Sequence, residues 1–203
     1  AARVMEGGSG FQRGDVWVEY KGGARDALTR LAEELDLPTR ELSESPLSLN
    51  SIDPHRVGLF KPWIASMDEG WTRFVLEQYD FPLVSLDNEA MRTGKFTEQV
   101  DVLVFPDISP KVISKGDPGP SRWGHFVPLP PPYQGGIDKW PGESPKLTGG
   151  QRIRKWVKEG GTVVALDSST AYFIKLFKLP IDNVLNGVGR EEFLCPGSTL
   201  SVS

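Results

Sequence analysis

Two short apolar runs limit the possible folds of this 203-residue chain more than any other feature. DVLVFPD, residues 101–107, is almost continuously apolar and is closed by Pro106, and TVVALD, residues 162–167, follows a pair of glycines. Runs of this kind are typical of strands that are buried on both faces of a parallel sheet. Parallel strands need crossover connections, which are usually helical. The chain is therefore expected to place helices on both faces of a mostly parallel sheet.

The segments around these runs supply the helices and further strands. The spacing of apolar residues predicts a helix over 24–37, and a second over 151–159 that presents Ile153, Trp156 and Val157 on one face and stops at Gly160–Gly161. A third helix is predicted in SSTAYFIKLFKLP, residues 168–180. GDVWVEY (14–20) and HRVGLF (55–60) read as short strands. We expect a three-layer α/β domain of flavodoxin-like or amidotransferase-like type.

The expected domain organisation has two parts. Residues 1–50 form a strand–helix extension and connector, which either completes the sheet or begins a preceding subdomain. Residues 51–203 form the α/β domain, with a long proline-rich loop at 107–147. The start, AARVMEGGSG, has neither an initiator Met nor an apolar signal region, and GSTLSVS at the other end reads as a strand. These ends suggest a segment of a longer protein.

Composition argues against several classes of function. The net charge is −4 and Lys and Arg do not cluster, so nucleic acid is not an expected partner. No apolar run approaches the ~18 residues that a membrane span requires, so membrane insertion is not expected. The only cysteine is Cys195 and the only histidines are His55 and His125. This supply is too small for a zinc site built from Cys and His, and no metal or cofactor is predicted.

One segment, KPWIASMDEGWTRFVLEQYDFP at 61–82, combines a strand exit with a helix start. Ser66 and Glu69 have the spacing of a capping box, and Asp68 lies near the positive end of the helix dipole. Trp71, Phe74 and Val75 follow at helical spacing, which predicts that the two aromatic residues belong to the core. The acidic pair is interpreted as a cap first, and a ligand-binding lip at Lys61–Trp63 remains open.

A ligand site is expected where the strands of an open parallel sheet end. Asp107 and the pair Asp167–Ser168 follow the two buried runs and could meet the 61–69 segment there. Asp167 could be a general base, a metal-binding carboxylate or a helix cap, and the cap fits best. The weak catalytic candidates are Asp167, Ser168, Asp107 and Glu69. The ligand-binding candidates are Lys61, Trp63, Asp68, His125 and Tyr133.

His125 and Tyr133 lie in the proline-rich stretch SRWGHFVPLPPPYQGG, residues 121–136. His125 either lines an aromatic pocket or belongs to a loop that packs its own aromatic residues against the sheet. The PLPPP run can dock on a partner as polyproline II or act as a rigid lid.

The sequence resembles two known groups of proteins. DVLVFPD, a helix that ends in two glycines, and GGTVVALDSST are similar to the class I glutamine amidotransferase-like fold. Laid on that family's elbow, where its catalytic Cys stands, this chain has Asp167 followed by Ser168. The family's catalytic His comes further along, and no His follows His125 here. The resemblance therefore implies the fold with a degenerate active site, without glutaminase activity.

At closer range, KPWIASMDEGWTRFVLEQYDFP, DVLVFPDIS, PPYQGGI, GGTVVALD and FLCPGS resemble a domain downstream of the catalytic domain in bacterial zinc-carboxypeptidase-like proteins. The resemblance covers roughly residues 50–203. The zinc motif itself is absent, because Gly58 and Pro128 stand where a Glu would follow each His.

The resemblance implies a non-catalytic accessory domain, for interaction or substrate positioning, whose parent is a metallocarboxypeptidase. Its partner would be the peptidase domain of that parent chain, or a further copy in a homo-oligomer. The same resemblance implies an extracytoplasmic or secreted location. The alternative is a hydrolase or ligand-binding domain with a rebuilt site around Asp107 and Asp167, so enzymatic activity of the segment is left open.

Overall fold

The computed structural model describes residues 2–5, 15–19, 24–42, 44, 49–51, 55–63, 65–116, 130–140, 142 and 146–194. The chain divides into two compact units, Ala1–Pro54 and His55–Ser203.

In its described residues, the first unit is a small antiparallel sheet with one helix. Its strand order is β2-β1-β3, and both outer strands run antiparallel to the central one. The predicted strand at 14–20 and helix at 24–37 are present in shorter form, whereas two further strands were not predicted. Because this sheet is separate, the predicted strand does not extend the parallel sheet. The elements are β1 (Ala2–Met5), β2 (Val16–Val18), α1 (Ala24–Glu34) and β3 (Leu49–Ser51).

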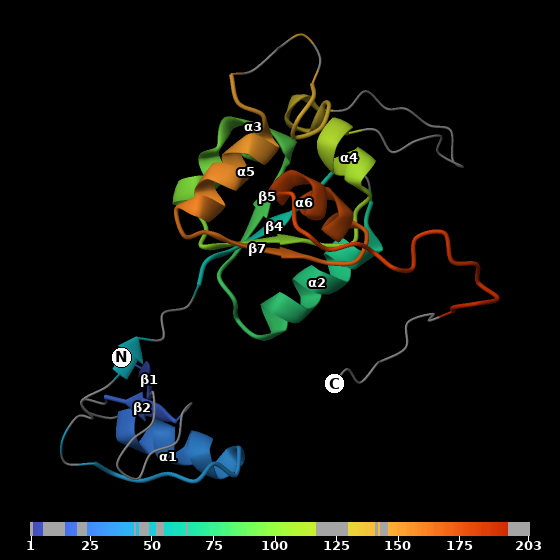
Figure 1. Cartoon of the computed structure of the whole chain (residues 1–203). Coiled ribbons are helices and arrows are strands. Elements are labelled where there is room, and N and C mark those ends of the chain that lie inside the picture. The colour runs from blue at the N-terminus through green and yellow to red at the C-terminus, as the bar shows by residue number, and fades with distance from the viewer. Residues whose placement is uncertain are drawn as a thin grey trace. The chain divides into compact units, whose positions relative to one another are not determined.

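The second unit is built on a four-stranded parallel sheet, which confirms the prediction of a flavodoxin-like three-layer α/β fold (Figure 1). The strand order is β5-β4-β6-β7, so the first strand of the unit lies inside the sheet. Sequence reasoning found three of these strands and missed β5, which follows closely on a helix. The strands are β4 (Val57–Phe60), β5 (Leu83–Leu86), β6 (Val102–Phe105) and β7 (Thr162–Ala165).

Helices lie on both faces of this sheet. Figure 1 shows α2 (Met67–Gln78) on one face, and α3 (Asn88–Thr93), α5 (Gly149–Lys158) and α6 (Ser169–Phe177) on the other. Right-handed crossovers require this split, because the chain moves outward from β4 to β5 and then in the opposite direction to β6 and β7.

In the described residues of the connections there are three further short helices. The 3-10 helix η1 (Lys95–Glu98) leads into β6. The other two, α4 (Pro110–Lys115) and the 3-10 helix η2 (Pro131–Tyr133), lie inside the segment that was predicted to be loop. Helix α4 has a local cause: Pro110 occupies its first turn, and Ser109 accepts a hydrogen bond from the N–H of Val112.

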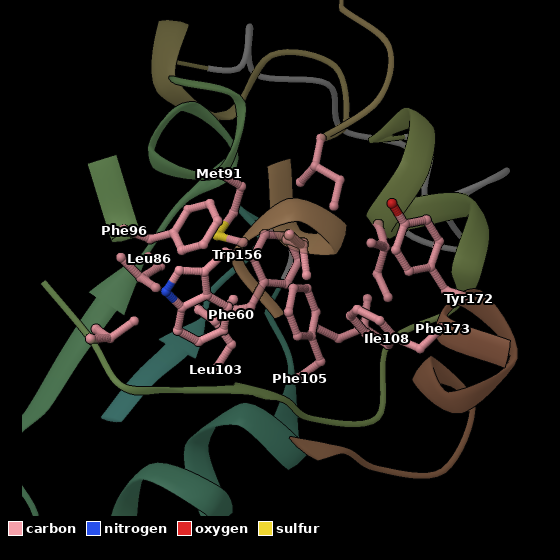
Figure 2. Close-up of a cluster of buried hydrophobic side chains, with 14 residues drawn as sticks. Phe60, Leu86, Met91, Phe96, Leu103, Phe105, Ile108, Trp156, Tyr172 and Phe173 are labelled. Atoms are coloured by element: carbon pink, nitrogen blue, oxygen red, sulfur yellow. The ribbon is translucent and has the colours of Figure 1, made fainter. Parts of the chain in front are cut away.

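The main core lies between the sheet and the helices α3, α5 and α6 (Figure 2). Strand side chains alternate, so that Phe60 and Phe105 enter this core and stack at 4.8 Å between ring centroids. Phe173 of α6 meets Phe105 edge-on at 4.7 Å. Trp156 of α5 is buried, which confirms the predicted face of that helix. The other face of the sheet has a smaller core in which Leu76 of α2 packs on valine and leucine side chains of the strands.

The prediction that Trp71 and Phe74 are core residues is wrong. Their side chains are 59% and 51% exposed, and the face of α2 that packs on the sheet carries Glu69, Arg73 and Leu76 instead. Along the helix, Trp71 lies two positions from Glu69 and Arg73, and Phe74 lies two positions from Leu76. Two positions correspond to about 200° of rotation at 3.6 residues per turn, so the exposed and the packed residues lie on opposite sides. A polar contact accounts for the orientation: Arg73 donates hydrogen bonds to Glu69 and to Ser85 of β5 beneath the helix.

Candidate functional site

A crevice lies at the carboxyl ends of β4 and β6. These two strands are neighbours at the point where the chain reverses its direction across the sheet, which is where open α/β sheets usually bind ligands. Two adjoining pockets, of about 500 Å³ and about 250 Å³, form the crevice and share residues of the β4–α2 connection. The shared residues are Pro62, Ala65, Ser66 and Met67.

The crevice brings together several of the residues singled out in the sequence. Lys61, Trp63 and Glu69 line the larger pocket. Asp68 and Asp107 line the smaller one, with Ile108 and Ser109 beside them. Asp167 and Ser168 are not among the lining residues of either pocket. A role in ligand binding or catalysis stays a prediction for all of them.

The start of α2 forms one wall of the crevice. Ser66 Oγ accepts a hydrogen bond from the N–H of Glu69 at 3.1 Å, so the predicted serine cap is confirmed. The reciprocal half of the capping box is replaced by an ion pair. Glu69 Oε1 accepts from Arg73 Nε at 3.0 Å and from Arg73 Nη2 at 2.5 Å, and Glu69 is 7% exposed. Its carboxylate is therefore held by the helix and is not a free base.

Asp107 forms a link between two strand exits. Its Oδ1 accepts a hydrogen bond from the backbone N–H of Ser168 at 3.2 Å, across from the end of β6 to the start of α6. The prediction that Asp167 caps α6 with its side chain is wrong. The N-cap residue is Ser168, without a side-chain cap bond, and Asp167 adopts a left-handed backbone with φ of 46°. This conformation turns the chain directly from strand to helix, and Asp107 supplies the acceptor for the turn.

Ser169 is fully buried at the same turn. Its Oγ donates to the carbonyl of Leu166 at 2.7 Å and lies 3.1 Å from the carbonyl of Phe105. The hydroxyl ties α6 to the end of β6, which is a structural role.

The described part of the proline-rich segment lies beside the crevice. The ring of Tyr133 packs on Trp63 at 5.1 Å between centroids, so two of the predicted ligand residues contact each other. His125 lies outside the described residues. Sequence reasoning missed what holds this segment: Asn88 and Arg92, four residues apart on α3. They escaped notice because β5 and α3 were not predicted.

Both side chains donate to backbone carbonyls of the 132–136 stretch. Asn88 Nδ2 donates to Gly135 at 2.7 Å and to Tyr133 at 3.2 Å. Arg92 Nη1 donates to Gln134 at 2.6 Å. The stretch is thereby fixed against α3.

The groups with clearly shifted pKa values lie away from the crevice. The Arg56 guanidinium bonds both carboxylate oxygens of Asp101, at 2.8 and 3.1 Å, and lowers the pKa of Asp101 to about 2. Both residues precede their strands and lie at the opposite end of the sheet. Burial, with the nearby carboxylate of Asp138, raises the pKa of Tyr172, whose hydroxyl donates to Asp138 Oδ2 at 2.7 Å. These shifts belong to structural contacts.

A second candidate surface is the outer stripe of α2, defined as Met67, Trp71, Phe74 and Val75. All four are at least half exposed, and the rings of Trp71 and Phe74 meet edge-on at 5.9 Å. Aromatic side chains offer about 150–250 Å² each, so at 59% and 51% exposure Trp71 and Phe74 leave roughly 200 Å² of apolar surface in water, to which Met67 and Val75 add. Patches of this size on monomeric proteins are often functional. The helical spacing of the apolar residues in 67–75 was visible in the sequence. Whether they face the sheet or the solvent was not.

Within the described ranges, no group of three or more His, Cys, Asp or Glu residues could hold a metal ion. Among the helices of that part of the chain, none has the length and apolar character of a membrane span.

Fold and crevice together define a flavodoxin-like three-layer α/β domain. Comparison of the chain with models of protein families, with curated proteins and with solved structures returned no match.

Proposed function

We propose that this chain is a non-catalytic domain for interaction or substrate positioning. The observation that carries the proposal is the outer stripe of α2, which is apolar and lies in water although the opposite face of the same helix buries an ion pair. Placing Trp71 and Phe74 in solvent gives up burial that would stabilise the domain. A binding surface accounts for this cost, because a partner restores the burial.

The crevice supports the same conclusion. Glu69 is paired with Arg73, and Asp107 accepts from the N–H of Ser168. Ser169 is buried, and its hydroxyl donates to the carbonyl of Leu166. Nucleophilic catalysis needs a nucleophile within hydrogen-bond reach of a base. The described hydrogen bonds of these residues serve the helix starts and contain no such pair.

The resemblance to the region downstream of zinc-carboxypeptidase-like catalytic domains suggests the setting. We propose that the partner is the peptidase domain of the same parent protein and that the protein acts outside the cytoplasm. Peptide hydrolysis would then belong to the parent's zinc site, and this domain would position that site or its substrate.

Hydrogen exchange tests the interaction function without knowledge of the substrate. Amides of 67–79 should exchange at least tenfold more slowly in the full-length parent than in the isolated chain. The substitution Trp71→Glu should abolish this protection, whereas Phe193→Glu, at a similarly exposed aromatic outside α2, should not. Equal exchange rates of these amides in the parent and in the isolated chain would refute the proposal.

A second candidate function rests on the crevice itself. Lys61 lines the larger pocket and Asp68 and Asp107 line the smaller one, both at the switch point of the sheet, which favours a ligand-binding or hydrolase domain with a rebuilt site. The double substitution Asp107→Asn with Asp167→Asn separates the two functions. Unchanged peptidase activity of the parent favours the interaction domain, and loss of turnover with a folded protein favours the rebuilt site.

A further inference from the structure

Two apolar areas lie in water on the α2 side of the sheet: the outer stripe of α2 and the uncovered face of β7. Helix α2 packs against β4 and β5, and Val104 of β6 is buried on this face. Val164 of β7, however, is 39% exposed, and Leu166 just after it is 40% exposed. Parallel sheets are normally covered on both faces. The α2 side of β7 therefore lacks a covering element in the described structure.

The dimensions of this uncovered area match one helix. Neighbouring strands are about 4.8 Å apart, so β7 lies about 10 Å from β4 across β6. Packed helices have axes about 8–10 Å apart. Because α2 packs over β4 and β5, a helix placed alongside it would lie over β6 and β7. Such a helix would cover Val164 and Leu166, and a partner that also reaches over the exposed side of α2 would cover the outer stripe.

The charge around α2 indicates what kind of helix fits. The segment 66–82 carries four acids and one base, a net −3 within a chain of −4. The base, Arg73, is already paired with Glu69 and lies 3.7 Å from Glu77. Lys61 is the base at the crevice end, where it lines the same pocket as Met67. The net charge around the stripe stays negative when Lys61 is included. The exposed acidic residues near the stripe are Asp68, Glu77 and Asp80.

A second copy of this chain is a poor occupant on this evidence, because it would bring two acidic rims together. Like charges across an interface oppose association, and opposite charges favour it. An anionic membrane surface is disfavoured for the same reason.

Resting on the proposed interaction function, we infer that this face binds an amphipathic helix of a partner protein that has an apolar stripe and a basic flank. The apolar contact with Trp71 and Phe74 supplies most of the affinity, since buried aromatic residues dominate such grooves. Asp68, Glu77 and Asp80 select the basic flank and make binding sensitive to salt.

Two synthetic helical peptides test the inference on the full 203-residue chain. They share one leucine stripe and carry either lysine or glutamate at the polar positions. Calorimetry measures affinity, and the indole N–H signals of selectively labelled tryptophan report whether Trp71 is the contact. The lysine peptide should bind at least tenfold more tightly than the glutamate peptide, and should weaken at least fivefold between 50 and 500 mM NaCl.

Variants separate this site from general attraction to an acidic protein. Trp71→Ala should weaken the lysine peptide at least tenfold, and Glu77→Gln two- to fivefold. Phe193→Ala, which removes an exposed aromatic outside α2, should leave affinity within twofold. Loss of lysine-peptide binding in both aromatic variants, or in neither, would show that the stripe is not the site.

The remaining outcomes overturn the inference in distinguishable ways. Equal binding of both peptides through Trp71 would refute the basic partner but keep the interaction function. Sedimentation that shows a dimer below 50 µM, dispersed by Trp71→Glu, would assign the face to a second copy. Trp71-dependent binding to phosphatidylserine vesicles would assign it to a membrane. Absence of lysine-peptide binding would refute the inference, while the exchange experiment on the parent judges the interaction function separately.

Discussion

Arg73 and Glu69 form an ion pair with 2.5 Å between Nη2 and Oε1, beneath α2 and beside Ser85 of β5. The pair lies on the side of the helix where Trp71 and Phe74 were expected. Both side chains of the pair belong to α2, so the contact that holds the rotation of the helix is the bond from Arg73 Nη2 to Ser85 Oγ of β5 at 2.9 Å, which leaves the apolar stripe in water.

Removing Arg73 should destabilise the domain. Arg73→Met leaves the Glu69 carboxylate without its partner, with side-chain exposure of only 10%. We expect a loss of about 2–4 kcal/mol in the free energy of unfolding, measured with urea at neutral pH. Lys155→Met is the matched control, because Lys155 and Glu159 have the same spacing but are 70% and 61% exposed. Its effect should stay within about 0.5 kcal/mol. Equal effects of the two substitutions would contradict the buried role of Arg73.

The two tryptophans at 71 and 156 should differ in their contribution to stability. Trp156→Ala removes a buried ring that meets Phe96 edge-on, and should cost about 3–5 kcal/mol. Trp71→Ala should cost less than about 1 kcal/mol in the isolated chain, because the ring is more than half exposed. Chemical unfolding checks both values. A Trp71→Ala variant as unstable as Trp156→Ala would show that Trp71 is a core residue.

The ion pair between Arg56 and Asp101 should give an acid-side dependence of stability. The pKa of Asp101 in the folded protein, about 2, lies below the ordinary value of 3.8. A lowered carboxyl pKa means that the folded state binds the proton less readily than the unfolded state. The stabilisation is therefore complete above about pH 4 and is lost as pH falls toward 2. A ¹³C NMR titration of the Asp101 carboxyl measures this directly.

Arg56→Gln should raise the pKa of Asp101 toward 3.8, because the charged partner is lost. Arg154→Gln, at an exposed position on α5, should leave it near 2. An unchanged pKa in Arg56→Gln would show that another group lowers it.

The turn between β7 and α6 should respond differently to its two aspartates. Asp107→Ala removes the acceptor of the Ser168 N–H and should cost about 0.5–2 kcal/mol, as the loss of a helix cap does. Asp167→Gly should be neutral or stabilising by up to about 1 kcal/mol, because glycine adopts the left-handed backbone without steric cost. Thermal unfolding compares them. A large loss in Asp167→Gly would indicate a side-chain role that the structure does not contain.

Asn88 should hold the segment that follows the proline run. Asn88→Ala removes donors to the carbonyls of Tyr133 and Gly135. The amide of Ile137, which donates to Ile113 at 2.9 Å, should then exchange at least tenfold faster. Thr93→Ala, whose hydroxyl bonds only within α3, serves as the control and should leave this amide unchanged. Unchanged exchange in Asn88→Ala would assign the anchoring to Arg92 and to the backbone bonds with Ile113 and Ser114.

The parallel sheet could be predicted because its signal is local. DVLVFPD and TVVALD are almost continuously apolar, which is typical of strands in a parallel sheet. The expected burial on both faces holds for β6 but is wrong for β7, whose Val164 is 39% exposed. The face of α5 was equally predictable, since Ile153 and Trp156 repeat at helical spacing with charged residues between them. β5 escaped prediction because LVSL is short and its pattern is shared by strands and helix ends.

The crevice was predictable only in part. Lys61, Asp68 and Asp107 follow strand ends, and strand ends of a parallel sheet meet at one edge, so their common position follows from the fold class. The hydrogen-bond partners of these acidic side chains do not follow from the fold class. The contact of Asp107 with Ser168 spans 61 positions in the chain, and it depends on the order of β6 and β7 in the sheet.

By itself the sequence determined the class of fold, since the period and length of its apolar runs reflect burial that each segment needs wherever it lies. It also determined the serine cap of α2, which involves residues three apart. Only the tertiary structure decided how α2 is rotated. The helix has an apolar side and a polar side that can both pack, and the choice depends on Ser85 and Arg73 meeting across two elements. That choice places the outer stripe in solvent, and with it the surface from which the function is proposed.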